Sequence, residues 1–285
     1  MAIKIASMKP HCSAPEWQAR VDLAACYRLV DLYGMSDMMA NHISSHVPGE
    51  PGAFLINAYG LMYEEITASS LIKVNLAGDI LAKPDFGASA QGRSQADAPP
   101  RGADDPQGRP GGQQVIDYGV NRAGYVIHSA IHAARPEVAC VIHTHAFASM
   151  AVSALQCGLL PITQTAMRFL KIGYHDYQGV VLDEAEKASL LADLGEREAL
   201  ILRNHGALVV GRTVGEAFNW AHRLELACRT QLAAMATQSA LVPVPPDVLE
   251  ATWNNYQRGT RRPYGLMEWP ALLRKLDRLD PGYAT

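Results

Sequence analysis

Residues 138–145, with the sequence VACVIHTH, decide the fold that we expect for this chain. The run before the histidines is apolar, uncharged and rich in β-branched residues, which is typical of a strand buried on both faces. Side chains alternate along a strand, so His143 and His145 point the same way, with β-carbons roughly 6–7 Å apart. Both imidazoles could then bind one ion at about 2 Å. The alternative is two ordinary histidines at the rim of the core, although burying two imidazoles without a shared partner is costly.

A third histidine lies between two further apolar runs. Residues 199–202 (ALIL) and 207–210 (ALVV) are predicted strands, and His205 lies in the tight link between them. A histidine beside a glycine in a turn is a weak signal on its own. If its imidazole joined the other two, three neutral imidazoles would leave open positions on a divalent ion. That arrangement is typical of catalytic rather than structural metal sites.

Composition narrows the class of protein. The 285 residues are 48% hydrophobic, which suits one or two globular domains with a sizeable core. A net charge of −3 argues against nucleic acid or an anionic membrane as partners. No apolar stretch could span a bilayer, and the N-terminus lacks the apolar core of a secretion signal. The five cysteines form no C-x-x-C pair, so we expect reduced thiols in a cytoplasmic protein and no cysteine ligation of the metal.

The order of the predicted elements indicates one sheet. Several strands follow one another directly, without a regular strand–helix–strand rhythm, which predicts a mixed or antiparallel sheet with helices on both faces. The predicted helices are residues 15–34, 125–135, 148–155, 184–194 and 214–235, and the other predicted strands are 41–47, 54–56 and 72–76.

Two segments stand apart from this pattern. Residues 84–115 are dense in Gly, Pro, Ala, Gln, Arg and Asp and cannot bury enough surface to offset their ordering entropy. We expect a disordered or loosely attached insertion there, although an error in the reading frame would leave the same compositional trace. The main domain is predicted to cover residues 15–239. The aromatic tail, residues 240–285, is expected to pack on that domain or on a neighbouring subunit.

Several long motifs occur in a characteristic order along the chain. They are residues 27–34, 41–43, 60–70, 128–136, 141–145, 158–161, 173–179 and 200–206. With these motifs the chain resembles the class II aldolase/adducin family from about residue 18 to residue 238, and the adducin head domain in particular. The resemblance implies a three-layer α/β/α sandwich with a central mixed, largely antiparallel sheet. It also implies a homotetramer with active sites between subunits.

The same resemblance implies that His143, His145 and His205 are the ligands of a divalent metal. Zn²⁺ is the ion that we favour, with Mn²⁺ or Fe²⁺ as alternatives, because imidazole ligands alone do not separate them.

The chain departs from the sugar-phosphate aldolases of that family at one motif. Those enzymes carry a Pro-Ser-Ser-Glu string, in which the Glu acts as acid/base and the serines help to hold the substrate phosphate. Here residues 121–124 read NRAG, so Gly124 replaces the carboxylate. The turn at Gly60, a predicted substrate-binding residue, keeps its glycine but loses its hydroxyl-rich context. The resemblance therefore implies a non-phosphorylated substrate.

Five further residues are candidates for the site. His175 and Tyr174 are predicted as the acid/base groups, with turn formation as the alternative role of their loop. Gln164 and Arg168 follow the metal strand and are predicted to face the substrate, where Arg168 would bind a carboxylate. A solvated helix face is the alternative for Arg168. Asn41 lies where the family's substrate loop begins, as does His42 next to it, and capping of that loop is the alternative role for both.

His128 and His132 are spaced four residues apart on a predicted helix and could form a second metal pair. No third ligand is evident near them in the sequence. We therefore expect packed helix histidines.

These features predict a metal-dependent lyase that acts on a small, non-phosphorylated oxygenated acid. Aldol cleavage or decarboxylation would proceed through a metal-stabilised enolate. Two alternatives remain open: a non-haem iron oxygenase on the same three histidines, and an adducin-like module that binds actin or another partner through a vestigial pocket. The retained histidines and the absence of a basic tail favour the enzyme.

Overall fold

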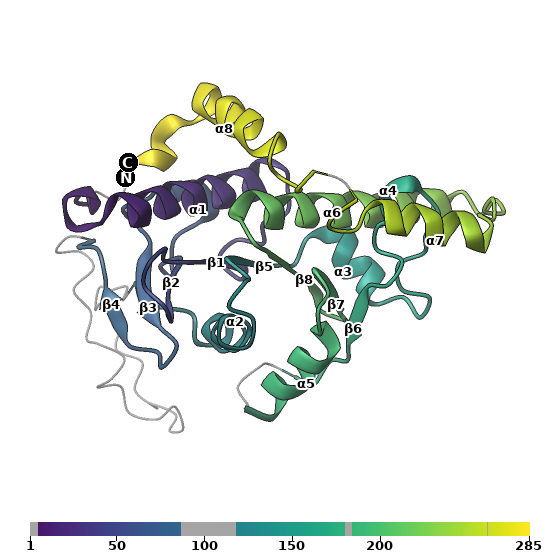
Figure 1. Cartoon of the computed structure of the whole chain (residues 1–285), viewed down its shortest axis with the longest axis horizontal. Helices are drawn as coiled ribbons and strands as arrows, with labels where there is room; N and C mark the ends of the chain where they lie inside the picture. The colour runs from purple at the N-terminus through teal and green to yellow at the C-terminus, as the bar shows by residue number, and fades with distance from the viewer. Residues whose placement is uncertain (1–4, 87–117, 180–183, 261) are drawn as a thin grey trace, which may run out of the picture.

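One eight-stranded sheet lies between two layers of helices in the computed structural model (Figure 1). The structure describes residues 5–86, 118–179, 184–260 and 262–285. Beyond its first three residues, the predicted insertion at 84–115 therefore lies outside the described residues. The layers confirm the expected α/β/α sandwich.

The strands follow the order β4-β3-β2-β1-β5-β8-β7-β6. All neighbours are antiparallel except β6 and β7, which run parallel, so the predicted mixed, largely antiparallel sheet is confirmed. The strands are β1 (His42–His46), β2 (Ala53–Ile56), β3 (Ile72–Asn75), β4 (Ile80–Ala82), β5 (Cys140–Thr144), β6 (Gly173–His175), β7 (Ala199–Leu202) and β8 (Gly206–Gly211).

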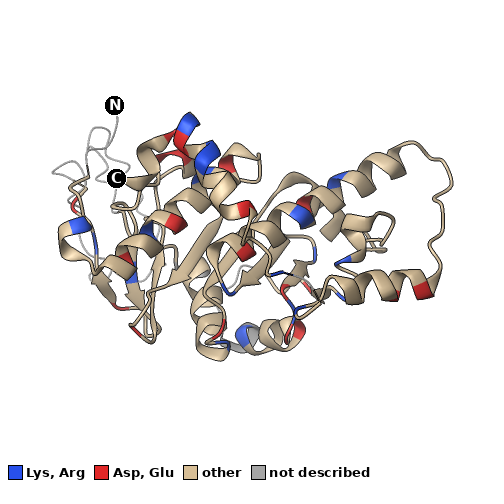
Figure 2. Cartoon of the chain, turned by 45° about the horizontal axis from the view of Figure 1, so that its top comes forward, with Lys and Arg blue, Asp and Glu red and all other residues tan. Residues whose placement is uncertain are grey.

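Helices α1 and α6 run along one face of the sheet, and α2 and α5 cover the other (Figure 1). No helix of the described segments is long and apolar enough to cross a bilayer. The helices are α1 (Ala14–Leu32), α2 (Arg122–Ala134), α3 (Phe147–Ser153), α4 (Gln164–Met167), α5 (Glu184–Leu194), α6 (Val214–Ala236), α7 (Pro246–Asn255) and α8 (Glu268–Leu279), with the 3₁₀ turns η1 (Lys9–His11), η2 (Tyr63–Glu65) and η5 (Pro281–Ala284). Basic and acidic residues are interspersed along them, in line with the small net charge (Figure 2).

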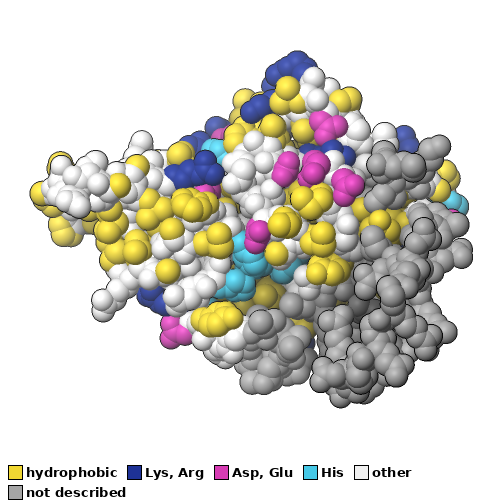
Figure 3. All heavy atoms as spheres, turned by 180° about the vertical axis from the view of Figure 1, so that it is seen from behind, with side chains coloured by type: hydrophobic (Ala, Val, Ile, Leu, Met, Phe, Trp, Pro, Cys, Tyr) yellow, Lys and Arg dark blue, Asp and Glu magenta, His cyan; other side chains and the backbone are white. Residues whose placement is uncertain are grey.

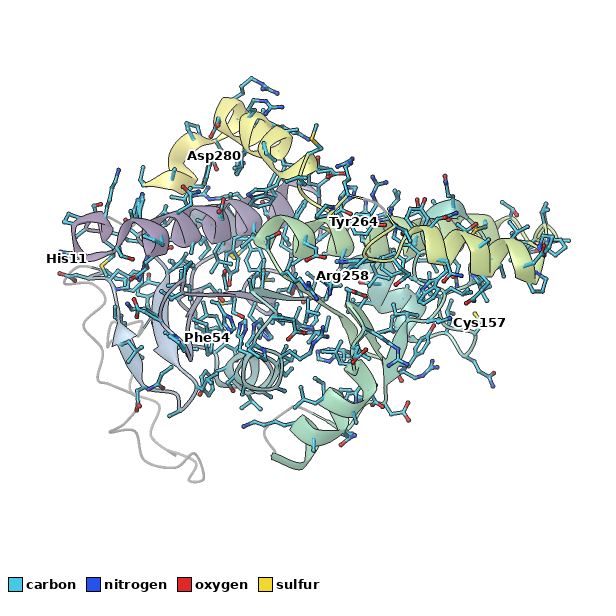
Figure 4. The ribbon with its side chains drawn as sticks, in the orientation of Figure 1. His11, Phe54, Cys157, Arg258, Tyr264 and Asp280 are labelled. Atoms are coloured by element: carbon cyan, nitrogen blue, oxygen red, sulfur yellow. The ribbon has the colours of Figure 1, made fainter. Side chains whose placement is uncertain are left out.

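Alternation along the strands builds two separate apolar cores. In β5, Cys140 and Ile142 belong to the core beneath α1 and α6, whereas Val141 belongs to the core beneath α2 and α5. In β1, Ile43 faces α1. Because neighbouring side chains point to opposite faces, His42 and Ser44 face α2. Phe54, labelled in Figure 4, lies on this same side, where its ring centre is 5.0 Å from the ring centre of His132.

The C-terminal segment contains two helices that the sequence analysis did not anticipate. Helix α7 packs against α4, and α8 packs against α1. The Arg168 guanidinium forms cation–π contacts with this segment, since it lies 4.6 Å from the ring centre of Tyr256 and 4.8 Å from that of Tyr264. The predicted boundary between domain and tail at residue 240 stays a prediction.

The hydroxyl of Tyr27 ties α1 to the start of β1. Tyr27 is fully buried, and its oxygen accepts hydrogen bonds from the backbone N–H groups of Ile43 at 2.8 Å and Asn57 at 3.2 Å. The hydroxyl also lies 2.9 Å from Oδ1 of Asn57. One side chain therefore satisfies backbone groups of two segments and fixes the position of His42 relative to the helix layer.

We predict that Tyr27→Phe lowers the free energy of unfolding by about 1–3 kcal/mol, because it leaves two buried N–H groups without an acceptor. Urea unfolding followed by circular dichroism measures the change. Tyr33→Phe is the matched control, since the Tyr33 hydroxyl is part-buried and contacts only Lys275 at 3.2 Å among the described residues; we expect its effect to stay within about 0.5 kcal/mol. Equal effects of both variants would contradict the role given to Tyr27.

Candidate metal centre

Three histidines converge at one edge of the sheet. His143 lies near the end of β5, His145 directly follows that strand, and His205 lies in the turn between β7 and β8. Because β8 is antiparallel to both β5 and β7, the carboxyl ends of those two strands meet at the same edge. Nε2 of His145 lies 3.0 Å from Nε2 of His143 and 3.0 Å from Nε2 of His205. The structure thus brings together the three predicted ligands, whose ligand atoms all lie within 4.8 Å of one another.

The turn that carries His205 has a particular backbone. Asn204 has a φ of 56°, in the left-handed region that asparagine tolerates better than most residues. A Cβ on Gly206 would lie 2.4 Å from the carbonyl oxygen of Thr144, so only glycine lets the turn pack this closely against β5. The backbone N–H of His205 also donates to Oγ of Ser153 at 3.2 Å. These contacts fix the third imidazole beside the other two.

Neighbouring acceptors set the tautomers of two ligands. Nδ1 of His143 lies 3.1 Å from the carbonyl oxygen of Ala207, and Nδ1 of His145 lies 3.0 Å from a carboxylate oxygen of Asp37. Both acceptors lack a proton to donate, so each Nδ1 carries the hydrogen and each Nε2 presents a lone pair. Two lone pairs cannot form a hydrogen bond with each other. Two nitrogens bound to one tetrahedral ion at about 2.0–2.1 Å lie about 3.3 Å apart. The Nε2–Nε2 distances of 3.0 Å are close to this value, so the donor set fits a divalent metal.

Burial keeps two of the ligands, His143 and His205, neutral. It lowers the pKa of His143 well below its usual value, with the neighbouring histidines adding to the effect. It also lowers the pKa of His205 to about 4, again with a contribution from nearby histidines. Neutral imidazole is the form that binds metal ions, so at neutral pH these side chains need not lose a proton to become ligands.

The centre is open on one side. His143 is buried, whereas His145 and His205 are only part-buried, and Figure 3 shows histidine side chains together in the middle of one face. Apolar residues border this opening. Phe147, which begins α3 just after His145, is 75% exposed, and Tyr177, whose ring centre lies 6.2 Å from that of His205, is 55% exposed. A small molecule or a neighbouring surface can therefore reach the ligands from outside.

The cluster of His143, His145 and His205 is called the trio below. A chain of buried polar side chains extends from it beneath α2. The ring of His42 lies 4.9 Å from that of His143, and its Nδ1 lies 2.7 Å from Nε2 of His128. Nδ1 of His128 is hydrogen-bonded to Oγ of Ser44, which in turn lies 2.8 Å from Nε2 of His132. His128 and His132 therefore meet at a serine. Throughout the described segments, the trio is the one group with three candidate ligand atoms this close together.

The two predicted acid/base residues lie on opposite faces of β6. His175 is buried beside Leu202 of β7, its Nδ1 lies 2.8 Å from Oδ2 of Asp193, and its proximity helps to lower the pKa of His205. The Tyr174 hydroxyl instead accepts a hydrogen bond at 2.9 Å from the backbone N–H of Leu159. His175 thus lies at the edge where the trio converges. The catalytic roles of both residues stay predictions.

The four predicted substrate residues are dispersed. Asn41 is buried directly before β1, and its Oδ1 has no partner among the described residues. Gly60 lies in the turn after β2 with a φ of 108°, and Gln164 is exposed at the start of α4. Arg168 is buried against aromatic rings of α6 and of the C-terminal segment. Contact of these four residues with a substrate stays a prediction.

Two residues near the trio were not among the predicted site residues. Asp37 orients His145 across 108 residues of chain, and no local motif announces such a contact. His42 was expected with Asn41 at the start of the substrate loop, but its position opposite His143 depends on the pairing of β1 with β5, which is a property of the fold.

Comparisons with known proteins agree with this geometry. The family model of the class II aldolase and adducin N-terminal domain matches residues 21–232. A Pseudomonas aeruginosa protein, named only provisionally as an aldolase class 2 protein, is 42% identical over 98% of this chain and 96% of its own length. Rat alpha-adducin is 39% identical over 93% of this chain, which matches 34% of the adducin sequence. The chain therefore belongs to the class II aldolase/adducin family.

Solved structures share the fold. An aldolase II superfamily protein from Pseudomonas syringae superposes with a TM-score of 0.83 at 39% identity, over 98% of this chain and 100% of that one. The L-fuculose 1-phosphate aldolase of Glaciozyma antarctica superposes with a TM-score of 0.73 at 25% identity, over 99% of this chain and 96% of that one.

We predict that the fold loses stability as the pH falls below about 6.5, the unfolded-state pKa of histidine. Burial, helped by neighbouring histidines, holds the pKa of His128 and His132 well below that value in the folded state. The unfolded chain therefore takes up protons that the folded chain does not, and stability that is complete above this pH falls by up to about 1.4 kcal/mol per pH unit for each histidine. Urea midpoints at pH 7.5, 6.5 and 5.5 measure the trend. The exposed His11 provides the control His11→Ala, which should keep the same slope, and a midpoint that does not change with pH would contradict the prediction.

Proposed function

We propose that this chain is a divalent-metal-dependent lyase that acts on a small, non-phosphorylated oxygenated acid by aldol cleavage or decarboxylation. The observation that carries the proposal is the convergence of three imidazoles, with the tautomers of His143 and His145 set so that their Nε2 lone pairs face one another. Zn²⁺ is the metal that we propose, and Mn²⁺ or Fe²⁺ would suit the same donors.

Each residue of the proposed site would have a separate role. His143, His145 and His205 would hold the ion, which when bound would polarise a substrate carbonyl and stabilise the enolate that carbon–carbon cleavage produces. Asp37 orients His145 by accepting a hydrogen bond from its Nδ1. His175, hydrogen-bonded to Asp193, is the acid/base group that we propose, with Tyr174 as the further candidate.

The substrate class follows from what surrounds the trio. Residues 121–124 provide neither the paired serines expected to hold a phosphate nor a carboxylate at position 124. This supports an acid without phosphate, although the Glaciozyma relative is named for a sugar phosphate. Asn41 directly precedes β1 and Gly60 follows β2, and we propose them, with Gln164 and Arg168, as substrate contacts.

Exposed apolar residues near the trio, here called the apolar rim, support the assembly of several copies of the chain. Phe147 and Met38, which are 75% and 65% exposed, flank His145 and Asp37 along the chain. We propose that a second copy covers this rim in a homotetramer, because monomeric proteins seldom leave such residues grouped in water.

The adducin relatives favour a second function, binding of actin or another partner, and cosedimentation with actin filaments tests it. Saturable cosedimentation in the absence of metal binding would replace the enzyme proposal.

We predict that the purified protein binds one divalent ion per chain. His143→Ala, His145→Ala and His205→Ala should each weaken Zn²⁺ binding by at least about 100-fold, because each removes one of three protein ligands. Isothermal titration and elemental analysis measure the loss. His11→Ala is the control, since Figure 4 places His11 at the outer end of α1. Failure of the unaltered protein to bind any divalent ion at micromolar concentration would end the enzyme proposal.

We predict a smaller effect at Asp37. Replacing it by alanine removes the acceptor that fixes the His145 tautomer, so Zn²⁺ affinity should fall by about 10–100-fold without loss of the fold. Asp31→Ala is the matched control, because that carboxylate contacts Ser36 rather than a histidine. Equal Zn²⁺ affinity in both variants would show that Asp37 has no part in the centre.

The activity itself is tested on the metal-loaded protein with a panel of hydroxy-keto and β-keto acids. We predict release of a keto acid or of carbon dioxide from at least one of them, and its loss in His205→Ala. Consumption of oxygen with Fe²⁺ and an organic acid, without cleavage under anaerobic conditions, would instead identify the oxygenase.

A further inference from the structure

Positions 42 and 124 compete for one volume beside the trio. Gly124 lies in the first turn of α2, facing β1. A Cβ built on it would lie 2.4 Å from Cδ2, 2.6 Å from Cγ and 2.8 Å from Nε2 of His42. Carbon atoms that are not bonded do not approach this closely, so any side chain at position 124 would require the ring of His42 to move.

That volume adjoins the candidate metal ligands. His42 is the cross-strand partner of His143, and the two side chains leave the sheet on the same face. Their ring centres are 4.9 Å apart with an interplanar angle of 35°. His42 is 4% exposed, so its ring is almost fully buried at this place. The ring therefore forms the wall of the site on the α2 side.

A buried network holds the ring in this place. Nδ1 of His42 is bound to Nε2 of His128 at 2.7 Å, and His128 is fixed on its other side by Ser44. Ser44 is held in turn by His132 at 2.8 Å. Such a network specifies one arrangement, because any break leaves a buried polar atom without a partner. No described residue forms a hydrogen bond with Nε2 of His42, so this nitrogen is free for a bound molecule.

We propose that His42 is a further catalytic residue, whose Nε2 hydrogen-bonds an oxygen of the acid bound at the histidine trio. It takes the place that a side chain at position 124 would occupy, so that an imidazole from β1 provides the polar group that α2 lacks there. The inference rests on the proposed metal site and deepens it. It assigns the substrate an oxygen that lies on the α2 side of the ion.

Two substitutions separate the two nitrogens of the ring. In His42→Asn the short amide can replace Nδ1 and keep the contact with His128, but nothing replaces Nε2. In His42→Gln the longer amide reaches the place of Nε2. The probe is oxalate, which carries two oxygens suited to one metal ion, added to the Co²⁺-loaded protein and followed by the visible absorption of the metal.

We expect both variants to bind Co²⁺ within about threefold of the unaltered protein. The oxalate Kd should rise about tenfold or more in His42→Asn, as for a lost hydrogen bond to a charged group, and clearly less in His42→Gln. An unchanged oxalate Kd in His42→Asn, with Co²⁺ bound normally, would overturn the inference and leave the metal site intact. Failure of the unaltered protein to bind Co²⁺ would instead mark the failure of the proposed function.

Gly124→Ala provides a second route that keeps the ring. Its Cβ should displace His42 and weaken oxalate binding about as much as His42→Asn does, again with Co²⁺ binding kept. The double variant His42→Asn with Gly124→Ala should show no further loss, because both changes remove the same contact. An oxalate Kd that Gly124→Ala leaves unchanged, or losses that add in the double variant, would show that the ring and the bound acid do not meet.

Discussion

The antiparallel register of β5, β8 and β7 is the constraint on which the site depends. His143 is paired with Leu208 and Thr144 with Ala207, while Leu202 is paired with Gly206. This register places the turn that contains His205 directly beside the end of β5. A slip of one residue would turn the metal strand over and move His143 to the other core, where no ligand could meet it. The two apolar cores, which differ in every second residue of these strands, make such a slip costly.

The same backbone also prepares the chemistry of the ligands. The carbonyl of Ala207 belongs to the strand that pairs with β5, so the hydrogen bond that fixes the His143 tautomer comes with the sheet itself. His145 lies beyond the end of β5 and obtains its acceptor from Asp37, in the loop between α1 and β1. The fold thus presents lone pairs toward one point before any ion arrives. A cation bound as proposed would relieve the repulsion between these lone pairs.

Much of this architecture could be predicted from local sequence, because the buried strands are apolar runs and the helices have clear periodicity. Residues 184–194 form a helix with the predicted bounds, and the three candidate ligands were recognisable. The helices α7 and α8 were not anticipated, since their stability comes from packing on α4 and α1 rather than from a local signal. The contact of Asp37 with His145 and that of His42 with His143 were not anticipated, because both depend on pairings between distant segments.

The exchange of a carboxylate for an imidazole has an electrostatic consequence. A carboxylate at position 124 would reduce the positive charge of a bound divalent ion. Burial, with a contribution from neighbouring histidines, instead lowers the pKa of His42 well below its usual value, so its ring is neutral. On a divalent ion held as proposed, three imidazole ligands and a neutral neighbour would leave almost the full double charge, offset only by the Asp37 carboxylate behind His145. Such a centre attracts an anionic chelating group more strongly than a neutral sugar hydroxyl pair. The glycine at position 124 and the histidine at position 42 therefore both support the proposed acid substrate.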